Sequence, residues 1–270
     1  MRLNKYIAHN SKYSRREADK LIEEGKVKIN NQYVKDFSYD VQEGDRVFVN
    51  GKLIKPKPKH EVTMIVYNKP KGSLVTKKDD RGRTTIYHLL PGKFRHFIPV
   101  GRLDFASEGL LLLTDNPYYA DILMKSKLPR VYNIKINKPL TNEMIEAMKN
   151  GLELDDASAG AHQKSEIKQM SFAPFDGFLV KSEGKNHTKL KVAISEGKNR
   201  ELRRFFGHFG ADVLDLKRVS YGFIELNNLP ENKTRYLTKK EYEMLHDFVK
   251  EQERLAKKET KEQKKASKEE

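Results

Sequence analysis

The chain has 270 residues, and its 53 lysines and arginines against 38 aspartates and glutamates give a formal net charge of +15. It contains no cysteine, which excludes a disulfide framework, a thiolate metal site and a cysteine nucleophile. The N-terminus shows no apolar leader, and the longest apolar run, Gly109 to Leu113, is far too short to span a bilayer. Length and composition therefore predict a soluble, cytoplasmic protein of about two domains.

The positive charge is densest near the N-terminus. Residues 1–60 carry a net charge of +6, residues 61–249 carry +7 and residues 250–270 carry +2. Such an excess favours a polyanionic partner, because lysines and arginines placed against phosphates release condensed counterions. A solvated surface would explain the same composition equally well, so charge alone leaves both interpretations open.

Residues 1–59 have the pattern of a small α/β module. Ser14 and Glu17 have the spacing of a capping box, so a helix is predicted to begin at Arg15, and Gly25 suits the residue after its end. The predicted strands of this module are Val27–Ile29 and Val47–Val49, with turns at Asn30-Asn31 and Gly44-Asp45.

Two arginines fall in the first turn of that helix, Arg15 and Arg16. Free backbone N–H groups and the positive end of the helix dipole add to their charge at this position. We therefore expect a phosphate backbone to dock there.

The alternating lysines and prolines of residues 55–59 predict a stiff linker to a second domain at residues 60–249. Its predicted strands are Met64–Tyr67, Tyr132–Ile136, Lys189–Ile194 and Val213–Val219. Its predicted helices are Pro117–Lys125, Asn142–Asn150, Arg200–Phe209 and Lys239–Val249, the last after a capping box of Thr238 and Glu241. Because these elements do not follow a βαβ rhythm, we predict an α+β fold with a mixed, largely antiparallel sheet and flanking helices.

Residues 250–270 are predicted to be a charged tail, disordered or a frayed helix.

Several common functional motifs are missing. None of the glycine-lysine pairs completes a phosphate-binding loop, and no G-x-G-x-x-G sequence occurs. The eight histidines lack the i, i+4 spacing of a zinc-binding helix. We therefore predict no metal and no nucleotide cofactor.

The segment 101–109 looks different from ordinary scaffold. Arg102 and Asp104 lie two residues apart between glycines, directly before an apolar strand. Glycines allow unusual backbone angles and the close approach of a ligand, which favours a binding loop. The alternative is a turn in which Asp104 caps a local N–H group.

Two further segments are strongly basic. Residues 196–204 place three arginines at the start of a predicted helix, where they repel one another unless an anion or a carboxylate lies among them. The three are Arg200, Arg203 and Arg204. A solvated basic face is the alternative, and Lys69 to Gly72 is, taken alone, a generic basic turn.

Together these segments resemble the bacterial ribosomal RNA pseudouridine synthases of the RsuA/RluB group. The matching motifs are Lys69-Pro70-x-Gly72, Gly101 to Thr114, Tyr132 within Arg130 to Ile134, and Glu196 to Arg204. Residues 2–30 resemble the small RNA-binding domain named after ribosomal protein S-four. The resemblance spans most of the chain, and its motifs stand in the order that the family requires.

The resemblance implies an isomerase that breaks the C1′–N1 bond of a uridine, turns the base and rejoins it through C5. Such a reaction requires no redox cofactor, nucleotide or metal. Asp104 is the implied catalyst, as nucleophile at C1′ or as base at C2′. Arg203 is the implied partner that keeps Asp104 ionised in a dry pocket. Tyr132 would stack against the extracted uracil, and its hydroxyl could assist proton transfer at C5.

The resemblance also implies RNA contacts. Arg102 would fill the space that the extracted base leaves, and Lys69 is expected as a scaffold or RNA contact rather than a catalyst. The other predicted RNA-binding residues are Arg15, Arg16, Arg200 and Arg204. Glu201 stands where glutamine is commoner in the family, and it brings a negative charge beside these arginines.

The implied partner is ribosomal RNA or a pre-ribosomal particle, of the large rather than the small subunit, bound by a monomer. The rival hypothesis is a non-catalytic RNA-binding or ribosome-assembly factor that has kept the fold. Asp104, Tyr132 and Arg203 together favour the enzyme, because simple binding does not need a carboxylate placed against RNA.

Overall fold

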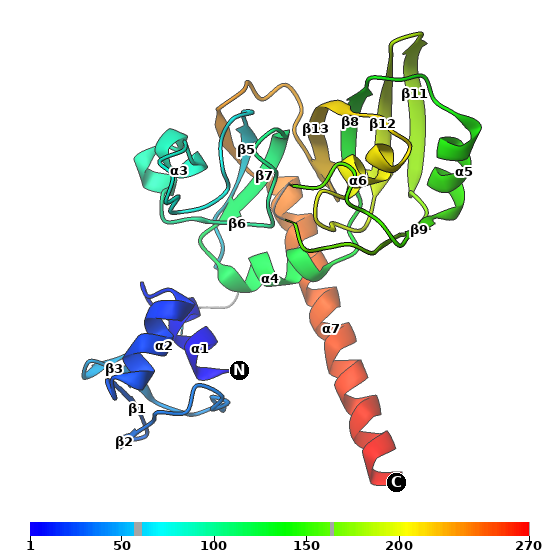
Figure 1. Cartoon of the computed structure of the whole chain (residues 1–270). Coiled ribbons are helices and arrows are strands. Elements are labelled where there is room, and N and C mark those ends of the chain that lie inside the picture. Colours follow the sequence, from blue (N-terminus) through cyan, green and yellow to red (C-terminus); the bar gives the residue numbers. More distant parts are fainter. Residues whose placement is uncertain (57–60, 163–164, 270) are drawn as a thin grey trace. The chain divides into compact units, whose positions relative to one another are not determined.

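The computed structural model describes residues 1–56, 61–162 and 165–269, with residues 259–261 and 263–269 as backbone only (Figure 1). Most of the predicted linker at 55–59 therefore lies outside the described residues. The chain divides into two compact units, Met1–Val62 with Asn116–Tyr118, and Thr63–Asp115 with Tyr119–Glu270.

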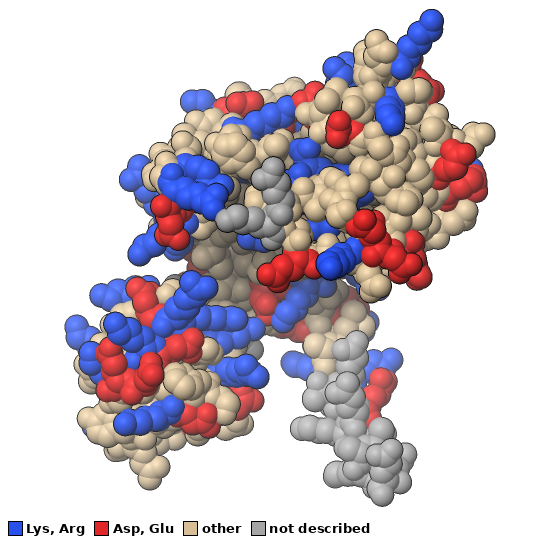
Figure 2. Space-filling view, in the orientation of Figure 1, with Lys and Arg blue, Asp and Glu red and all other residues tan. Residues whose placement is uncertain are grey.

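The smaller unit packs two helices against a four-stranded antiparallel sheet. The helices are α1 (Leu3–Asn10) and α2 (Arg15–Glu23), and the strands are β1 (Val27–Ile29), β2 (Gln32–Tyr33), β3 (Val47–Val49) and β4 (Lys52–Leu53), in the order β2-β1-β3-β4. The predicted capping box is confirmed, since the Glu17 N–H donates to the Ser14 hydroxyl at 3.2 Å and the Ser14 N–H donates to the Glu17 carboxylate at 2.7 Å. In the view of Figure 2, basic and acidic side chains are interspersed over the surface of this unit.

The larger unit is built on a nine-stranded sheet that is antiparallel except for one neighbouring pair among the described strands. Its main path is β11-β12-β8-β13-β7-β5-β15, while β14 pairs with β13 and β6 pairs with β7. The strands are β5 (Met64–Lys69), β6 (Ile98–Pro99), β7 (Glu108–Thr114), β8 (Arg130–Ile136), β11 (Gly177–Gly184), β12 (His187–Ile194), β13 (Val213–Tyr221), β14 (Ile224–Glu225) and β15 (Thr234–Tyr236). The predicted α+β class with a largely antiparallel sheet is confirmed.

Helices and a short hairpin accompany this sheet. The helices are α3 (Ile86–Leu89), α4 (Pro117–Lys125), α5 (Asn142–Asn150), α6 (Glu201–His208) and α7 (Lys239–Glu269), with a 3₁₀ turn at Gly92–Phe94; β9 (Leu152–Leu154) pairs with β10 (Met170–Phe172). Both α4 and α5 begin and end at the predicted residues. Phe205 and Phe206 of α6 are completely buried in the core against the sheet.

Two predicted helix ends are wrong. Arg200 precedes α6 as its N-cap, in the left-handed conformation with φ of 50°, rather than belonging to the helix. At the other end of the unit, α7 continues to Glu269, beyond its predicted end at Val249 and through the tail predicted to be disordered or a frayed helix. Beyond Val249 the helix has few apolar residues with which to pack. Residues of high helix propensity and close pairs of opposite charge, such as Glu251 and Arg254 at 2.9 Å, stabilise it instead.

The one parallel pairing joins β7 to β13, with Glu108 opposite Lys217 and Gly109 opposite Arg218. Gly109 has a φ of 101°, and a Cβ atom there would lie 2.2 Å from the Arg218 carbonyl oxygen. Only glycine lets the two backbones approach so closely. The contact therefore sets where β7 begins and where the preceding loop, residues 101–107, meets the sheet.

No helix among the described residues combines the length and the hydropathy that crossing a membrane requires.

Candidate active site

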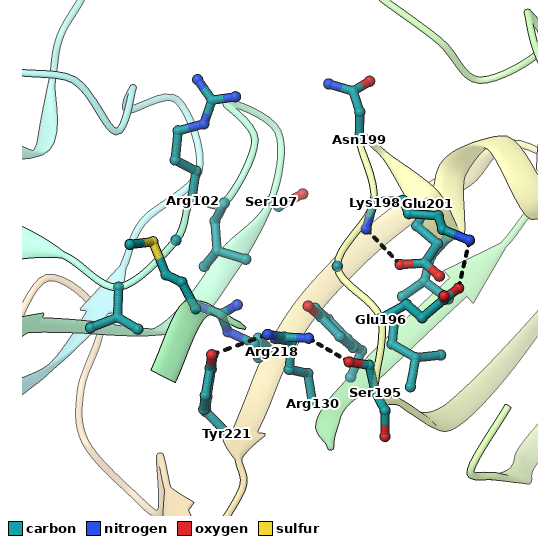
Figure 3. A pocket seen from close by; sticks show the side chains of 18 of the residues that line it. Arg102, Ser107, Arg130, Ser195, Glu196, Lys198, Asn199, Glu201, Arg218 and Tyr221 are labelled. Atoms are coloured by element: carbon teal, nitrogen blue, oxygen red, sulfur yellow. Dashed lines mark hydrogen bonds and ion pairs between the residues drawn. The ribbon is translucent and has the colours of Figure 1, made fainter. Parts of the chain in front are cut away.

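A cleft of about 810 Å³ lies within the larger unit. Three segments line it, residues 99–104, 124–127 and 194–202, together with side chains of β8 and β13 (Figure 3). Two of the segments singled out in the sequence, 101–109 and 196–204, therefore meet in one cavity.

The Asp104 side chain lines this cleft and is 34% exposed. Its Oδ2 atom lies 3.8 Å from Nη1 of Arg200. Among the described residues its carboxylate pairs with Arg200 and accepts no backbone hydrogen bond, so the structure shows neither the predicted pairing with Arg203 nor the alternative of a capping aspartate. Asp104 is also more open than the predicted dry pocket would make it.

The pairing follows from the backbone at Arg200. Arg200 precedes α6 in a left-handed conformation, its side chain lines the cleft, and its Nε donates to the Gly160 carbonyl at 2.8 Å. An ion pair at this distance and exposure is weak. It supplies an opposite charge while leaving the Asp104 carboxylate accessible.

Lys69, at the end of β5, is completely buried beneath the Asp104 loop. Its ammonium donates to the carbonyls of Pro70 at 3.0 Å, Asp104 at 3.2 Å and Ser107 at 2.8 Å. Burial lowers the pKa of Lys69 to about 8, against an opposing effect of Asp104 and Glu108. The predicted RNA contact of Lys69 is wrong, because the side chain is enclosed, and its scaffold alternative holds.

Arg203 supports the same loop from α6. Its Nη1 donates to the Val213 carbonyl at 2.8 Å, and its Nη2 donates to the Ala106 carbonyl at 3.1 Å and to the Ser107 hydroxyl at 3.4 Å. Burial lowers the pKa of Arg203, as does Arg200, whereas Asp104 raises it. Arg203 thus acts on the backbone just after Asp104 rather than on its carboxylate.

Two more predicted residues line the cleft with Asp104. Tyr132 extends from β8 and is 7% exposed, while Arg102 is exposed two residues before Asp104. The structure therefore brings Asp104, Tyr132, Arg102 and Arg200 into one cavity. Arg203 lies behind the loop and does not line it.

The predicted RNA contact of Arg204 is wrong, because the residue is completely buried. Its guanidinium donates to the Ala157 carbonyl, to the Ile167 carbonyl at 3.2 Å and to the Ser165 hydroxyl at 2.6 Å. Helical spacing placed Arg204 away from the phenylalanine face, but Ala157, Ser165 and Ile167 contact its guanidinium on that side of α6.

Glu201 does not face the arginines as an open charge. The residue is 6% exposed, and its carboxylate accepts the Lys198 N–H at 2.9 Å. Burial raises its pKa, while this backbone hydrogen bond lowers it. Glu201 therefore holds the turn that leads into α6, a local role that glutamine could also perform.

Arg15 and Arg16 lie in the first turn of α2 in the smaller unit, and both are exposed. No group of three or more side chains suited to hold a metal ion occurs among the residues that the structure describes.

Residues 63–208 match the family model of the RNA pseudouridylate synthases, and residues 1–47 match the S4 domain. The chain is 52% identical over 249 residues to an uncharacterized RNA pseudouridine synthase of Helicobacter pylori, an alignment that covers 92% of this chain and 95% of that protein. The chain belongs to the RNA pseudouridine synthase family.

Two further comparisons support this family membership of the synthase. It is 33% identical to the ribosomal large subunit pseudouridine synthase B of Bacillus subtilis, over 90% of this chain and 95% of that protein. A crystal structure of a pseudouridylate synthase superposes with a TM-score of 0.60 and 25% identity, over 91% of this chain and 99% of the other.

Sequence reasoning missed two arginines of the synthase cleft, Arg130 and Arg218. Both lie on strands whose inward residues alternate with outward ones, and both are buried. The available signal was an arginine two residues before Tyr132, on the same face of β8, where an apolar residue would be expected.

Lys69 makes the stability of the synthase depend on pH. Its folded-state pKa of about 8 lies below the unfolded value of about 10.4, so between them the unfolded chain binds more protons. The free energy of unfolding should therefore rise with pH across this window, relative to that of a Lys69→Met variant. Urea unfolding of both proteins at about pH 7.5 and about pH 9.5 measures this. A difference between the two proteins that does not change with pH would contradict it.

Proposed function

We propose that the synthase converts a uridine of ribosomal RNA to pseudouridine, with Asp104 as its catalytic carboxylate. The observation that carries this proposal is the fixed backbone and the accessible carboxylate of Asp104. Lys69 and Arg203 hold the loop by its carbonyls, while the side chain remains accessible in the cleft. Preorganisation of this kind suits a group that must meet a reacting atom.

The reaction asks Asp104 to act at the sugar. As nucleophile it forms a bond to C1′ while the C1′–N1 bond breaks; as base it removes the C2′ proton instead. In both cases the uracil must detach, turn and bond through C5, after which the C5 proton is lost and N1 gains one. Arg200, 3.8 Å from the carboxylate, supplies the charge that opposes Asp104 before substrate binds.

Tyr132 contacts the extracted base, and Arg102 contacts the RNA strand that the base has left. The Tyr132 ring, which lines the cleft, stacks against the extracted uracil, and its hydroxyl assists proton transfer at C5. Extracting the base costs roughly a few kcal/mol, which the planar guanidinium of Arg102 offsets by stacking in the vacated space.

The proposed substrate is large-subunit ribosomal RNA, alone or in a pre-ribosomal particle. The name of the Bacillus subtilis relative, a ribosomal large subunit pseudouridine synthase, supports this. The S4 domain match supports docking of RNA through the smaller unit, with Arg15 and Arg16 against phosphates. A non-catalytic RNA-binding factor would have no use for a carboxylate presented to the strand.

Asp104→Asn should abolish turnover, because the amide neither attacks C1′ nor accepts the C2′ proton. RNA affinity should change little, since the substitution removes a negative charge and keeps the shape. Chemical detection of pseudouridine in ribosomal RNA fragments, together with a filter-binding titration, measures both. Appreciable residual conversion would contradict the assignment of Asp104.

Arg15→Ala with Arg16→Ala should weaken RNA binding and flatten its salt dependence, because two phosphate contacts are lost. The slope of log Kd against log salt concentration should fall by about 1 to 2. Lys149→Ala with Lys239→Ala is the matched control, since it removes two exposed charges outside the smaller unit. An unchanged slope in the arginine variant would show that the module docks by another face.

A further inference from the structure

Two arginines at the floor of the cleft have no role in the function proposed above. Arg130 on β8 is 6% exposed and Arg218 on β13 is 3% exposed, yet both line the cavity (Figure 3). A guanidinium stays charged in any protein environment, so the floor holds two buried positive charges.

These arginines alternate with two tyrosines on one face of the sheet. In the pairing of β8 with β13, Tyr132 lies opposite Arg218 and Arg130 lies opposite Tyr221. The guanidinium carbons of Arg130 and Arg218 lie 4.9 Å and 5.3 Å from the centre of the Tyr221 ring. Arg218 is therefore the direct cross-strand neighbour of the ring proposed to stack on uracil.

The hydrogen-bond partners of both arginines are neutral. Arg130 donates to the Ser195 carbonyl at 2.8 Å and to the Tyr221 hydroxyl at 3.1 Å, and Nε of Arg218 donates to the Leu110 carbonyl at 2.7 Å. Nη2 of Arg218 is buried without any hydrogen-bond partner. Within the described part of the chain, neither arginine forms an ion pair.

Such an arrangement is costly without a ligand. The Glu201 carboxylate interacts electrostatically with Arg130, whereas among the described residues no carboxylate pairs with Arg218. Burying the Arg218 charge without a counterion costs several kcal/mol, and stacking on Tyr221 offsets only part of this. The floor is thus complementary to an anion or to a group that becomes one.

The reaction itself produces an anion at this place. When the C1′–N1 bond breaks, its electron pair leaves with the base, and C1′ becomes electron-deficient. Asp104 relieves this deficiency by bonding to C1′ or by removing the C2′ proton. The detached base is then uracilate, with its charge spread over N1, O2 and O4. A phosphodiester is joined to nucleotides on both sides, so the more exposed Arg102 and Arg200 suit it better than the floor does.

We propose that Arg218, assisted by Arg130, binds the uracil at the floor of the cleft and stabilises the negative charge of the detached base. Arg218 is then a catalytic residue that acts on the leaving group, while Asp104 acts on the sugar. This inference rests on the proposed function, because it concerns the same reaction.

Arg218→Gln tests the proposal in the full-length protein. Removing a donor aimed at developing charge should lower the single-turnover rate by roughly 10²-fold or more. The Kd for substrate RNA and its salt slope should stay unchanged, whereas a phosphate contact would lower that slope by about 1. Arg218→Lys should retain part of the rate, and Arg254→Gln, on the exposed side of α7, is the control for loss of an arginine.

A second readout separates leaving-group stabilisation from mere misfolding. A 5-fluoro substituent makes uracil more acidic, so the detached base needs less help from the protein. The rate ratio of wild type to Arg218→Gln should therefore be several-fold smaller for consumption of 5-fluorouridine than for uridine in the same RNA. Damage to the fold would lower both rates by the same factor.

The outcomes distinguish this inference from the proposed function. If wild type forms no pseudouridine in ribosomal RNA fragments, the proposed function fails. If wild type is active but Arg218→Gln keeps its rate, loses RNA affinity with a lower salt slope, or shows equal ratios for the two substrates, the uracil subsite is refuted.

Discussion

The parallel contact between β7 and β13 is the constraint on which the cleft depends. Gly109 lets the β7 backbone lie against the carbonyl of Arg218, where a Cβ atom would come within 2.2 Å. This contact joins the two halves of the large sheet and marks the end of the Asp104 loop. The loop that presents the Asp104 carboxylate leads into β7, and the partner strand β13 carries Arg218 opposite Tyr132. One close backbone approach therefore places the carboxylate proposed to act on the sugar near the side chains proposed to bind the base.

The cations around Asp104 perform different tasks according to their burial. Lys69 and Arg203 are enclosed, and they bind carbonyls of the loop, which fixes its backbone without neutralising the carboxylate. Arg200, less buried, lies 3.8 Å from the carboxylate. Because the scaffold cations engage the main chain, the Asp104 side chain remains available to substrate. Part of the chain's positive charge thus stabilises the backbone of the Asp104 loop.

Local signals predicted much of the fold, and long-range contacts account for what they missed. Capping boxes identified the starts of α2 and α7, since a cap and its partner stand only three residues apart. Arg203 was the expected partner of Asp104, whereas the observed pairing with Arg200 accompanies a left-handed residue at the helix start, which helical periodicity does not reveal. The burial of Arg204 depended on contacts with Ala157, Ser165 and Ile167, which lie in a stretch for which no structure was predicted. The motif residues were recognisable from the sequence, but their individual tasks required the packing.

The most direct test of the account is a pseudouridine map of ribosomal RNA from cells with and without the gene, complemented by wild type or by Asp104→Asn. The account predicts that at least one pseudouridine of large-subunit RNA disappears with the gene, returns with wild type and stays absent with the variant. A map that is identical in all four strains would contradict it.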